Sequence, residues 1–285
     1  MLSYRHAFHA GNAADVLKHA VLICCLDYLG QKEKPFLVID THAGAGFYPL
    51  TAGYAAQNRE WEGGVGRLLE CDNLPPLLGR YAALVKDSLG VELPAKLPPA
   101  GLYPGSPALI QRLLRPRDQA VCFELHPVDF TALKDAFKAD KRFRLLREDG
   151  LGGLKALLPP PSRRGCIFID PPYEVKSDYT EVPEHLAGAL TRFSTGLYIT
   201  WYPLLQQLSA SAVRETLLGL YGGNRCAAEL RTADPDNGVK RMYGSGMVIY
   251  NPPWTLRKTL EESLPVLASI LGGAEAAWDL WWEGE

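Results

Sequence analysis

The sequence places a carboxylate, two prolines and an aromatic ring in succession at residues 170–173, Asp-Pro-Pro-Tyr. The prolines remove two backbone donors and hold the chain extended, so the carbonyls of Asp170 and Pro171 face outward without a strand partner. Tyr173 adds a flat face on which a ring can stack. Acceptors for two amine hydrogens beside a stacking surface suit an exocyclic amine on an aromatic base. The stretch therefore indicates chemistry at such an amine, with a turn that merely ends a core strand as the alternative.

The elements around this loop predict that it lies at one edge of a sheet. Residues 166–169 are apolar throughout, which is typical of a parallel strand buried on both faces. Open α/β sheets bind ligands at the carboxyl ends of their strands, where Asp170 is expected. Another central strand is predicted over residues 35–40, and the loop after it holds His42 and two glycines that permit close backbone approach. Pro49 stands where a dinucleotide-binding loop has its third glycine, which disfavours a nicotinamide enzyme.

Three more polar positions are expected at strand ends or helix starts. Glu124 ends a strand over residues 120–124, and its carboxylate suits the two hydroxyls of a ribose. Asp149 and Gly150 follow a short strand, where the carboxylate suits an adenine amino group and a plain turn is the alternative. Ser106 is predicted to cap a helix over residues 108–114, which is compatible with its hydroxyl also facing a ligand.

Strands predicted at 197–203, 226–230 and 247–251 bring the total to seven, and the helices between them indicate a doubly wound α/β sheet. Residues 47–101 are too many for a plain loop and contain helical patches. We therefore expect two parts, a main domain over residues 1–46 and 102–285 and a mostly helical inserted subdomain over residues 47–101.

The amino-terminal segment predicts a helix capped by Asn12. Lys18 and His19 lie beside its apolar stripe, where a solvated face is the ordinary interpretation. The histidines at positions 6, 9 and 19 lack a carboxylate or thiolate at a recognisable spacing, so no metal site is expected.

Composition sets further limits. The 285 residues are 47% hydrophobic and 22% charged, as in ordinary soluble enzymes, with a formal net charge of -2. Any binding of nucleic acid must therefore be local rather than the result of a global basic field. The six cysteines show no paired spacing and are expected to be reduced core thiols. Because neither a signal segment nor a run of 18 apolar residues is present, we expect a cytoplasmic protein without membrane contact.

Taken together, these segments resemble the RlmJ family of bacterial 23S ribosomal RNA adenine-N6 methyltransferases. Asp-Pro-Pro-Tyr at 170–173 looks like the catalytic motif of methyltransferases that act on the amino groups of adenine or cytosine. The likeness covers nearly the whole chain and is weakest in the insertion after Gly46. It runs through residues 3–12, 15–19, 40–46, 103–107, 124–127, 149–150, 162–165, 170–173, 246–247 and 251–254.

The resemblance implies a Rossmann-like, seven-stranded methyltransferase fold, S-adenosylmethionine as cofactor, 23S ribosomal RNA as partner and a monomeric enzyme. It implies cofactor contacts from Lys18, His19, His42, Ser106, Glu124, Asp149, Gly150 and Asp170. The amino-terminal helix is expected to cover that cofactor. The catalytic residues would be Asp170, Pro171 and Tyr173, and Tyr4 would contact the RNA.

On this hypothesis an adenine leaves the RNA stack, its ring lies on Tyr173, and its N6 amine donates to Asp170 and the Pro171 carbonyl. Candidate phosphate contacts are Arg5, Lys18, Arg163, Arg164 and the basic residues of 138–144, although a solvated face is favoured for the last group. Two alternatives stay open. One is an adenine-N6 methyltransferase acting on DNA, and the other is a non-catalytic RNA-binding scaffold.

Overall fold

The computed structural model describes residues 5–90, 101–206, 210–234, 242–273 and 276–283. Its main sheet has eight strands in the order β10-β8-β9-β7-β6-β1-β4-β5. They are β1 (Leu37–Asp40), β4 (Gln119–Phe123), β5 (Phe143–Leu146), β6 (Gly165–Ile169), β7 (Leu197–Leu205), β8 (Arg225–Arg231), β9 (Met242–Tyr250) and β10 (Ala277–Glu283). The five strands from β7 to β5 are parallel, and the pairs β7–β9, β9–β8 and β8–β10 are antiparallel.

All seven predicted strands are present, and the expected α/β architecture is confirmed. The count of seven was too low, because β10 adds an eighth strand at the edge beside β8. Its side chains are exposed or only partly buried, so β10 lacks the apolar pattern of a core strand. Ion pairs from Arg214 to Asp279 and from Arg225 to Glu283 help to hold it on the sheet.

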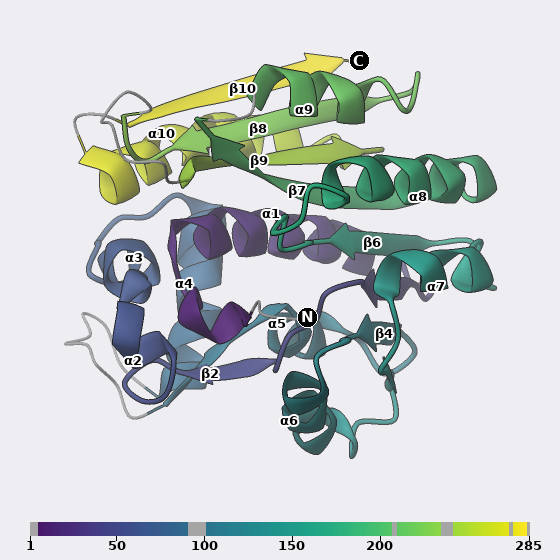
Figure 1. Cartoon of the computed structure of the whole chain (residues 1–285), viewed down its shortest axis with the longest axis horizontal. Helices are drawn as coiled ribbons and strands as arrows, with labels where there is room; N and C mark the ends of the chain where they lie inside the picture. Colours follow the sequence, from purple (N-terminus) through teal and green to yellow (C-terminus); the bar gives the residue numbers. More distant parts are fainter. Residues whose placement is uncertain (1–4, 91–100, 207–209, 235–241, 274–275, 284–285) are drawn as a thin grey trace.

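Helices cover both faces of the sheet (Figure 1). One group packs around α1 (Ala13–Gly30), which contacts α4 (Pro76–Leu89), α5 (Ser106–Leu113) and α10 (Leu256–Gly272). On the other face, α7 (Gly150–Leu157) contacts α8 (Asp178–Arg192), and α8 contacts α9 (Ala210–Leu218), while α6 (Pro127–Phe137) contacts β5. The parallel strands have their carboxyl ends at one edge of the sheet, and polar residues of the loops that follow them meet there.

The segment predicted as an insertion is helical in its described part, and residues 91–100 lie outside that part. It contains α2 (Ala55–Asn58), a π-helical turn η2 (Glu62–Gly66), α3 (Arg67–Leu69) and α4, between the paired short strands β2 (Phe47–Pro49) and β3 (Leu102–Pro104). Figure 1 places α2 and α3 together at one side of the molecule, away from α7 and α8. Because α4 packs on α1 and α3 on α10, the segment shares the core of the main domain, and its separation as a subdomain stays a prediction.

Two local predictions about helix starts have opposite outcomes. The Asn12 cap is confirmed, since its side chain accepts a hydrogen bond from the Asp15 amide. The Ser106 cap is wrong, because α5 begins at Ser106 itself with Gly105 as the capping residue. The Ser106 hydroxyl instead donates to Asp40 Oδ2 at 2.7 Å.

The solvated face expected around Lys18 and His19 is also wrong. The two side chains are 4% and 2% exposed, because α1 is enclosed by helices and by the sheet on most of its circumference. Of the six free thiols, four are buried in the core as predicted, whereas Cys24 and Cys71 are partly exposed. Among the described helices, none combines the length and the apolar character that crossing a bilayer requires.

Candidate active site

Two neighbouring cavities lie at the carboxyl ends of the parallel strands. The first, here called the carboxylate cavity, has a volume of about 250 Å³. It is lined by residues that include Thr41, His42, Gly44, Glu124, Asp149, Gly150, Asp170, Pro171 and Glu181. The second, here called the aromatic cavity, has a volume of about 570 Å³ and is lined by residues that include Lys18, Tyr173, Trp201, Pro203 and Met242. His6, Pro172 and Glu174 border both, so the cavities adjoin at the Asp-Pro-Pro-Tyr loop.

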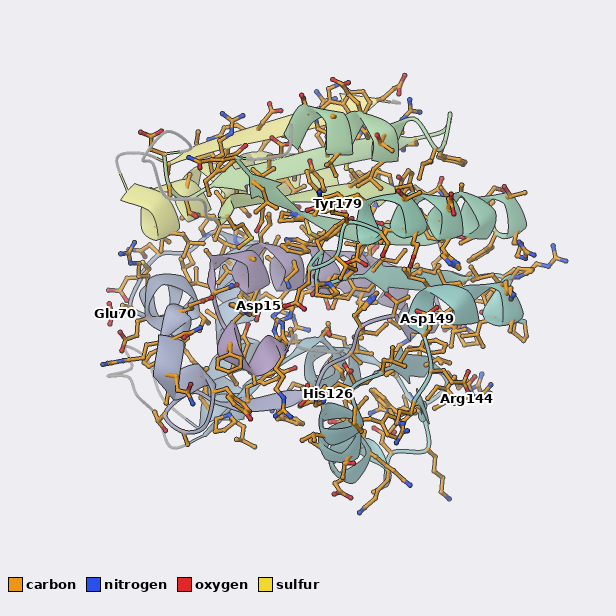
Figure 2. The ribbon with its side chains drawn as sticks, viewed as in Figure 1. Asp15, Glu70, His126, Arg144, Asp149 and Tyr179 are labelled. Atoms are coloured by element: carbon orange, nitrogen blue, oxygen red, sulfur yellow. The ribbon has the colours of Figure 1, made fainter. Side chains whose placement is uncertain are left out.

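The carboxylate cavity carries a strong excess of acidic side chains. Its acidic lining residues are Glu124, Asp129, Glu148, Asp149, Asp170, Glu174, Asp178 and Glu181. No lysine or arginine of the described chain is among the residues that line it. In the view of Figure 2, Asp15, His126, Asp149 and Tyr179 surround the middle of the molecule, whereas Glu70 and Arg144 lie toward its margins. The cavity therefore favours a cationic ligand over an anionic one.

The glycine loop after β1 orients the Glu124 carboxylate. Gly44 adopts a left-handed φ of 61°, and its amide donates to Glu124 Oε2 at 2.8 Å. The other oxygen, Oε1, accepts from the His126 amide at 2.6 Å. Burial raises the pKa of Glu124 despite these bonds. Each carboxylate oxygen accepts more than one hydrogen bond, so this fixed group can still receive two ligand hydroxyls.

Asp149 and Gly150 fix the opposite wall. The Asp149 side chain caps α7 by accepting from the amides of Leu151 and Gly152, at 3.3 and 2.8 Å. A Cβ at Gly150 would lie 2.1 Å from the Thr41 carbonyl oxygen, so only glycine lets α7 approach the loop after β1 this closely. The helix amino terminus and the loop thus close the cavity between them.

Asp40 and Ser106 lie beneath the loop rather than on either cavity. The Asp40 carboxylate is fully buried and accepts from the Ser106 hydroxyl and, at 3.2 Å, from the His42 amide. Burial raises the pKa of Asp40 to about 7, although both hydrogen bonds act in the opposite direction. Ser106 therefore supports the loop through Asp40 and makes no wall of its own.

The two histidines predicted for this site differ in position. His42 lines the carboxylate cavity, and its Nδ1 pairs with the Thr41 hydroxyl at 2.8 Å. His19 lines neither cavity, because its Nδ1 is engaged with the Tyr103 hydroxyl, which in turn pairs with the Tyr81 hydroxyl at 2.8 Å. Burial lowers the pKa of both imidazoles to about 4, so both are neutral near pH 7.

Asp170 is ion-paired with the amino-terminal helix. Lys18 Nζ donates to Asp170 Oδ2 at 2.7 Å and lies 3.1 Å from Asp15 Oδ1. Burial alone would lower the pKa of Lys18, yet the two carboxylates raise it above its ordinary value. Sequence reasoning missed Asp15, which is fully buried. Its spacing of three residues before Lys18 on one helix was the available signal.

The Asp-Pro-Pro-Tyr loop turns its aromatic ring inward. Tyr173 has a left-handed φ of 49° and is 7% exposed. Its ring lies 4.7 Å from the Tyr179 ring and 5.9 Å from Trp201, and Lys18 Nζ lies 5.0 Å from the Trp201 ring. Trp201, which sequence reasoning also missed, adds a second aromatic ring to the lining of the aromatic cavity. Tyr4 lies outside the described residues.

Several cations suggested for RNA contact are committed elsewhere. Arg164 donates to the carbonyls of Leu29 and Lys34, behind the end of α1. Arg142 pairs with Asp140, and Lys18 is buried in its ion pairs. These three side chains are therefore withdrawn as phosphate contacts.

Comparison with known proteins gives a consistent result. A family model described as "Ribosomal RNA large subunit methyltransferase D, RlmJ" matches residues 33–284. The chain is 41% identical to "Ribosomal RNA large subunit methyltransferase J" of Escherichia coli K12, over 98% of this chain and 99% of that protein. It is 39% identical to the protein of the same name from Haemophilus influenzae Rd, over 99% of each chain. A Legionella pneumophila crystal structure at 32% identity covers 97% of this chain and 99% of its own, with a TM-score of 0.86.

Proposed function

Because the chain belongs to the RlmJ family of ribosomal RNA large subunit methyltransferases, we propose that it transfers a methyl group from S-adenosylmethionine to the N6 amine of an adenine in 23S ribosomal RNA. The single observation that carries this proposal is the pair of cavities, one acidic and one aromatic, that adjoin at the Asp-Pro-Pro-Tyr loop. The acidic one suits a cationic donor, and the aromatic one suits an extruded base.

The residues of the carboxylate cavity fit S-adenosylmethionine. The eight acidic side chains suit a ligand that carries a sulfonium and an ammonium group. Glu124, whose orientation is fixed by two amides, would receive the ribose hydroxyls. Gly44 and Gly150 leave room for close approach, and His42 and Asp149 would complete the walls. When bound, S-adenosylmethionine supplies an electrophilic methyl group, because its sulfonium sulfur leaves readily as a neutral thioether.

His19, Ser106 and Lys18 take less direct parts in this proposal. His19 and Ser106 support the α1 and loop walls from behind, through Tyr103 and Asp40. Lys18 serves Asp170 rather than the donor, because it lines the aromatic cavity and not the acidic one.

The chain's own residues hold and activate the amine. Lys18 engages Asp170 Oδ2, and among the described residues nothing donates to Oδ1, which is left to accept from the adenine N6. The Pro171 carbonyl is the second acceptor, and hydrogen bonds to both resist delocalisation of the nitrogen lone pair into the ring. Tyr173 and Trp201 would contact the base in the aromatic cavity. Asp170 finally takes up the surplus proton, directly or through water.

A methyl-transfer assay with tritiated S-adenosylmethionine tests the proposal. We expect label in 23S ribosomal RNA and in no duplex DNA of matched length. Labelling of the DNA alone would identify the DNA-modifying alternative. Donor binding absent from calorimetry, together with retained RNA binding, would identify the scaffold. We further propose that the enzyme acts as a cytoplasmic monomer.

A further inference from the structure

We propose that Asp15 is a positioning residue for methyl transfer, which acts on Asp170 through the shared ammonium of Lys18. This inference rests on the proposed function. Asp15 lies in the first turn of α1, is fully buried, and lines neither cavity. It therefore cannot touch either substrate directly.

The geometry gives the two oxygens of Asp15 different tasks. Oδ2 is fixed by hydrogen bonds from the Gly11 amide at 2.8 Å and from His6 Nε2 at 3.0 Å. Oδ1 faces Lys18 Nζ at 3.1 Å without a well-directed hydrogen bond, while the ammonium aims its bond at Asp170. The Asp15 carboxylate thus compensates the charge of Lys18 from one side, while the directed hydrogen bond of the Lys18 ammonium goes to Asp170.

The charges explain why a second carboxylate matters. If Asp170 were the only partner of the buried Lys18 ammonium, any hydrogen bonding that Asp170 gave up to the substrate amine would leave the ammonium without charge compensation, which is energetically costly. Asp15 removes that cost, because its carboxylate still compensates the charge of Lys18 when Asp170 accepts a hydrogen bond from the adenine N6. Burial would raise the pKa of Asp15, but the neighbouring His6 and Lys18 hold it well below its ordinary value, so the charge is present throughout the neutral range.

Asp15 also connects this ion pair to the rim of the site. His6, which it holds, borders both the carboxylate and the aromatic cavity. One buried carboxylate therefore contacts both a side chain that lines the two cavities and the lysine that pairs with Asp170.

The experiment compares Asp15→Asn with Asp118→Asn. Asp118 is a matched control because it is also buried, accepts a hydrogen bond from the Phe36 amide and forms an ion pair with Arg115. It lies at the amino ends of the strands, away from the site. With 23S RNA and saturating S-adenosylmethionine, we expect kcat of Asp15→Asn to fall at least tenfold, with the donor Kd changed less than threefold. Asp118→Asn should lower Tm and leave kcat within twofold of the parent.

A second variant tests the path through Lys18. In a Lys18→Met background, adding Asp15→Asn should lower kcat less than twofold further, because the group it acts on is gone. If the two substitutions each lower kcat by their full separate factors, Asp15 does not act through Lys18 and the proposal is contradicted. A fall in kcat smaller than tenfold in a folded Asp15→Asn single variant contradicts it too.

If Asp15→Asn does not fold, Asp15→Glu replaces it. This variant keeps the charge and should retain at least a tenth of the parent kcat, and a lower value in a folded protein overturns the proposal. A parent protein that methylates no RNA would refute the proposed function, whereas an active parent with an equally active Asp15→Asn refutes only the role of Asp15.

Discussion

Lys18 Nζ lies 2.7 Å from Asp170 Oδ2, although the two residues are 152 positions apart in the chain. The Lys18 side chain is buried, and its ammonium also lies 5.0 Å from the centre of the Trp201 ring. The Asp-Pro-Pro-Tyr loop is therefore incomplete without α1, because the helix sets the orientation of its carboxylate.

Replacing Lys18 by methionine should lower kcat at least a hundredfold and change the Kd for S-adenosylmethionine less than threefold. Methionine keeps most of the apolar stem but leaves Asp170 without the bond that orients it. Lys86→Met is the matched control, since Lys86 is also buried but lies on α4 with no hydrogen-bond partner in the described chain. That control should keep the parent kcat. If calorimetry instead shows lost donor binding with an intact kcat, Lys18 belongs to the donor site.

The acidic lining of the carboxylate cavity predicts discrimination by charge. S-adenosylmethionine carries a sulfonium that S-adenosylhomocysteine lacks, so the cavity should bind the cationic donor more tightly than the neutral product. Raising NaCl from about 0.05 to about 0.5 M shortens the screening length several-fold and should weaken donor binding more than product binding. The measurement is calorimetry of both ligands at each salt concentration.

Variants of the same wall check that the effect is local. The double variant Glu148→Gln with Glu181→Gln removes two lining charges and should lower donor affinity several-fold, and more than it lowers product affinity, because only the donor carries the sulfonium. Glu215→Gln on α9, which lines neither cavity, is the control. Equal losses for both ligands would mean that charge does not select between them.

Asp40 predicts a pH dependence of stability with a defined sign. Its pKa is raised to about 7 in the folded protein, so the folded state holds a proton that the unfolded chain releases near pH 4. The contribution of Asp40 to stability is therefore fully present below about pH 4 and is lost as the pH rises toward 7, at about 1.4 kcal/mol per pH unit at most.

Asp40→Asn mimics the protonated group and should escape this loss. Its Tm relative to the parent should rise between pH 4 and pH 7 and then level off. Asp118→Asn should show no such rise between pH 4 and pH 7. Burial would raise the pKa of Asp118, but the hydrogen bonds and the charge of Arg115 lower it below its ordinary value, so the stability that depends on its ionisation is lost only below about pH 4. If the Tm of Asp40→Asn and that of the parent changed with pH in parallel, the pKa of Asp40 would have its ordinary value in the folded protein.

Gly150→Ala should damage both stability and donor binding. The added methyl would meet the Thr41 carbonyl at 2.1 Å, so α7 or the loop after β1 must move and the wall of the carboxylate cavity with it. We expect Tm to fall by several degrees and donor affinity at least tenfold. Gly30→Ala near the end of α1 is the control, since a Cβ there meets nothing within 4 Å. Unaltered donor binding by a folded Gly150→Ala protein would remove Gly150 from the site.

The seven strands of the main sheet other than β10, and the loops at the carboxyl ends of several of them, could be predicted from the sequence for a physical reason. Buried parallel strands are short apolar runs, and an aspartate marks the carboxyl end of two of them: Asp40 is the last residue of β1, and Asp170 directly follows β6. Strand β10 was not predicted because it is an edge strand with partly exposed side chains and lacks the continuous apolar run of a buried strand.

The burial of Lys18 could not be predicted from local pattern, although the three-residue spacing of Asp15 and Lys18 was a signal that these two side chains pair. A helix that is covered nearly all round has no polar face to read, and a lysine beside an apolar stripe is ordinarily solvated. The tertiary arrangement brings Asp170 to the helix, where it and Asp15 together offset the cost of burying that ammonium. Trp201 was missed for a related reason, since an aromatic residue in a core strand gives no sign that a cavity adjoins it.

The most direct test is methylation of 23S ribosomal RNA by the parent protein and by Asp170→Asn, with digestion to nucleosides and mass spectrometry of N6-methyladenosine. We predict one new N6-methyladenosine per RNA molecule with the parent. We predict a rate at least a thousandfold lower with the variant, whose donor Kd should stay within tenfold. Methyl transfer at the parent rate by a folded Asp170→Asn protein, or methylation at a position other than N6, would contradict the assignment of Asp170 as the acceptor for the adenine amine.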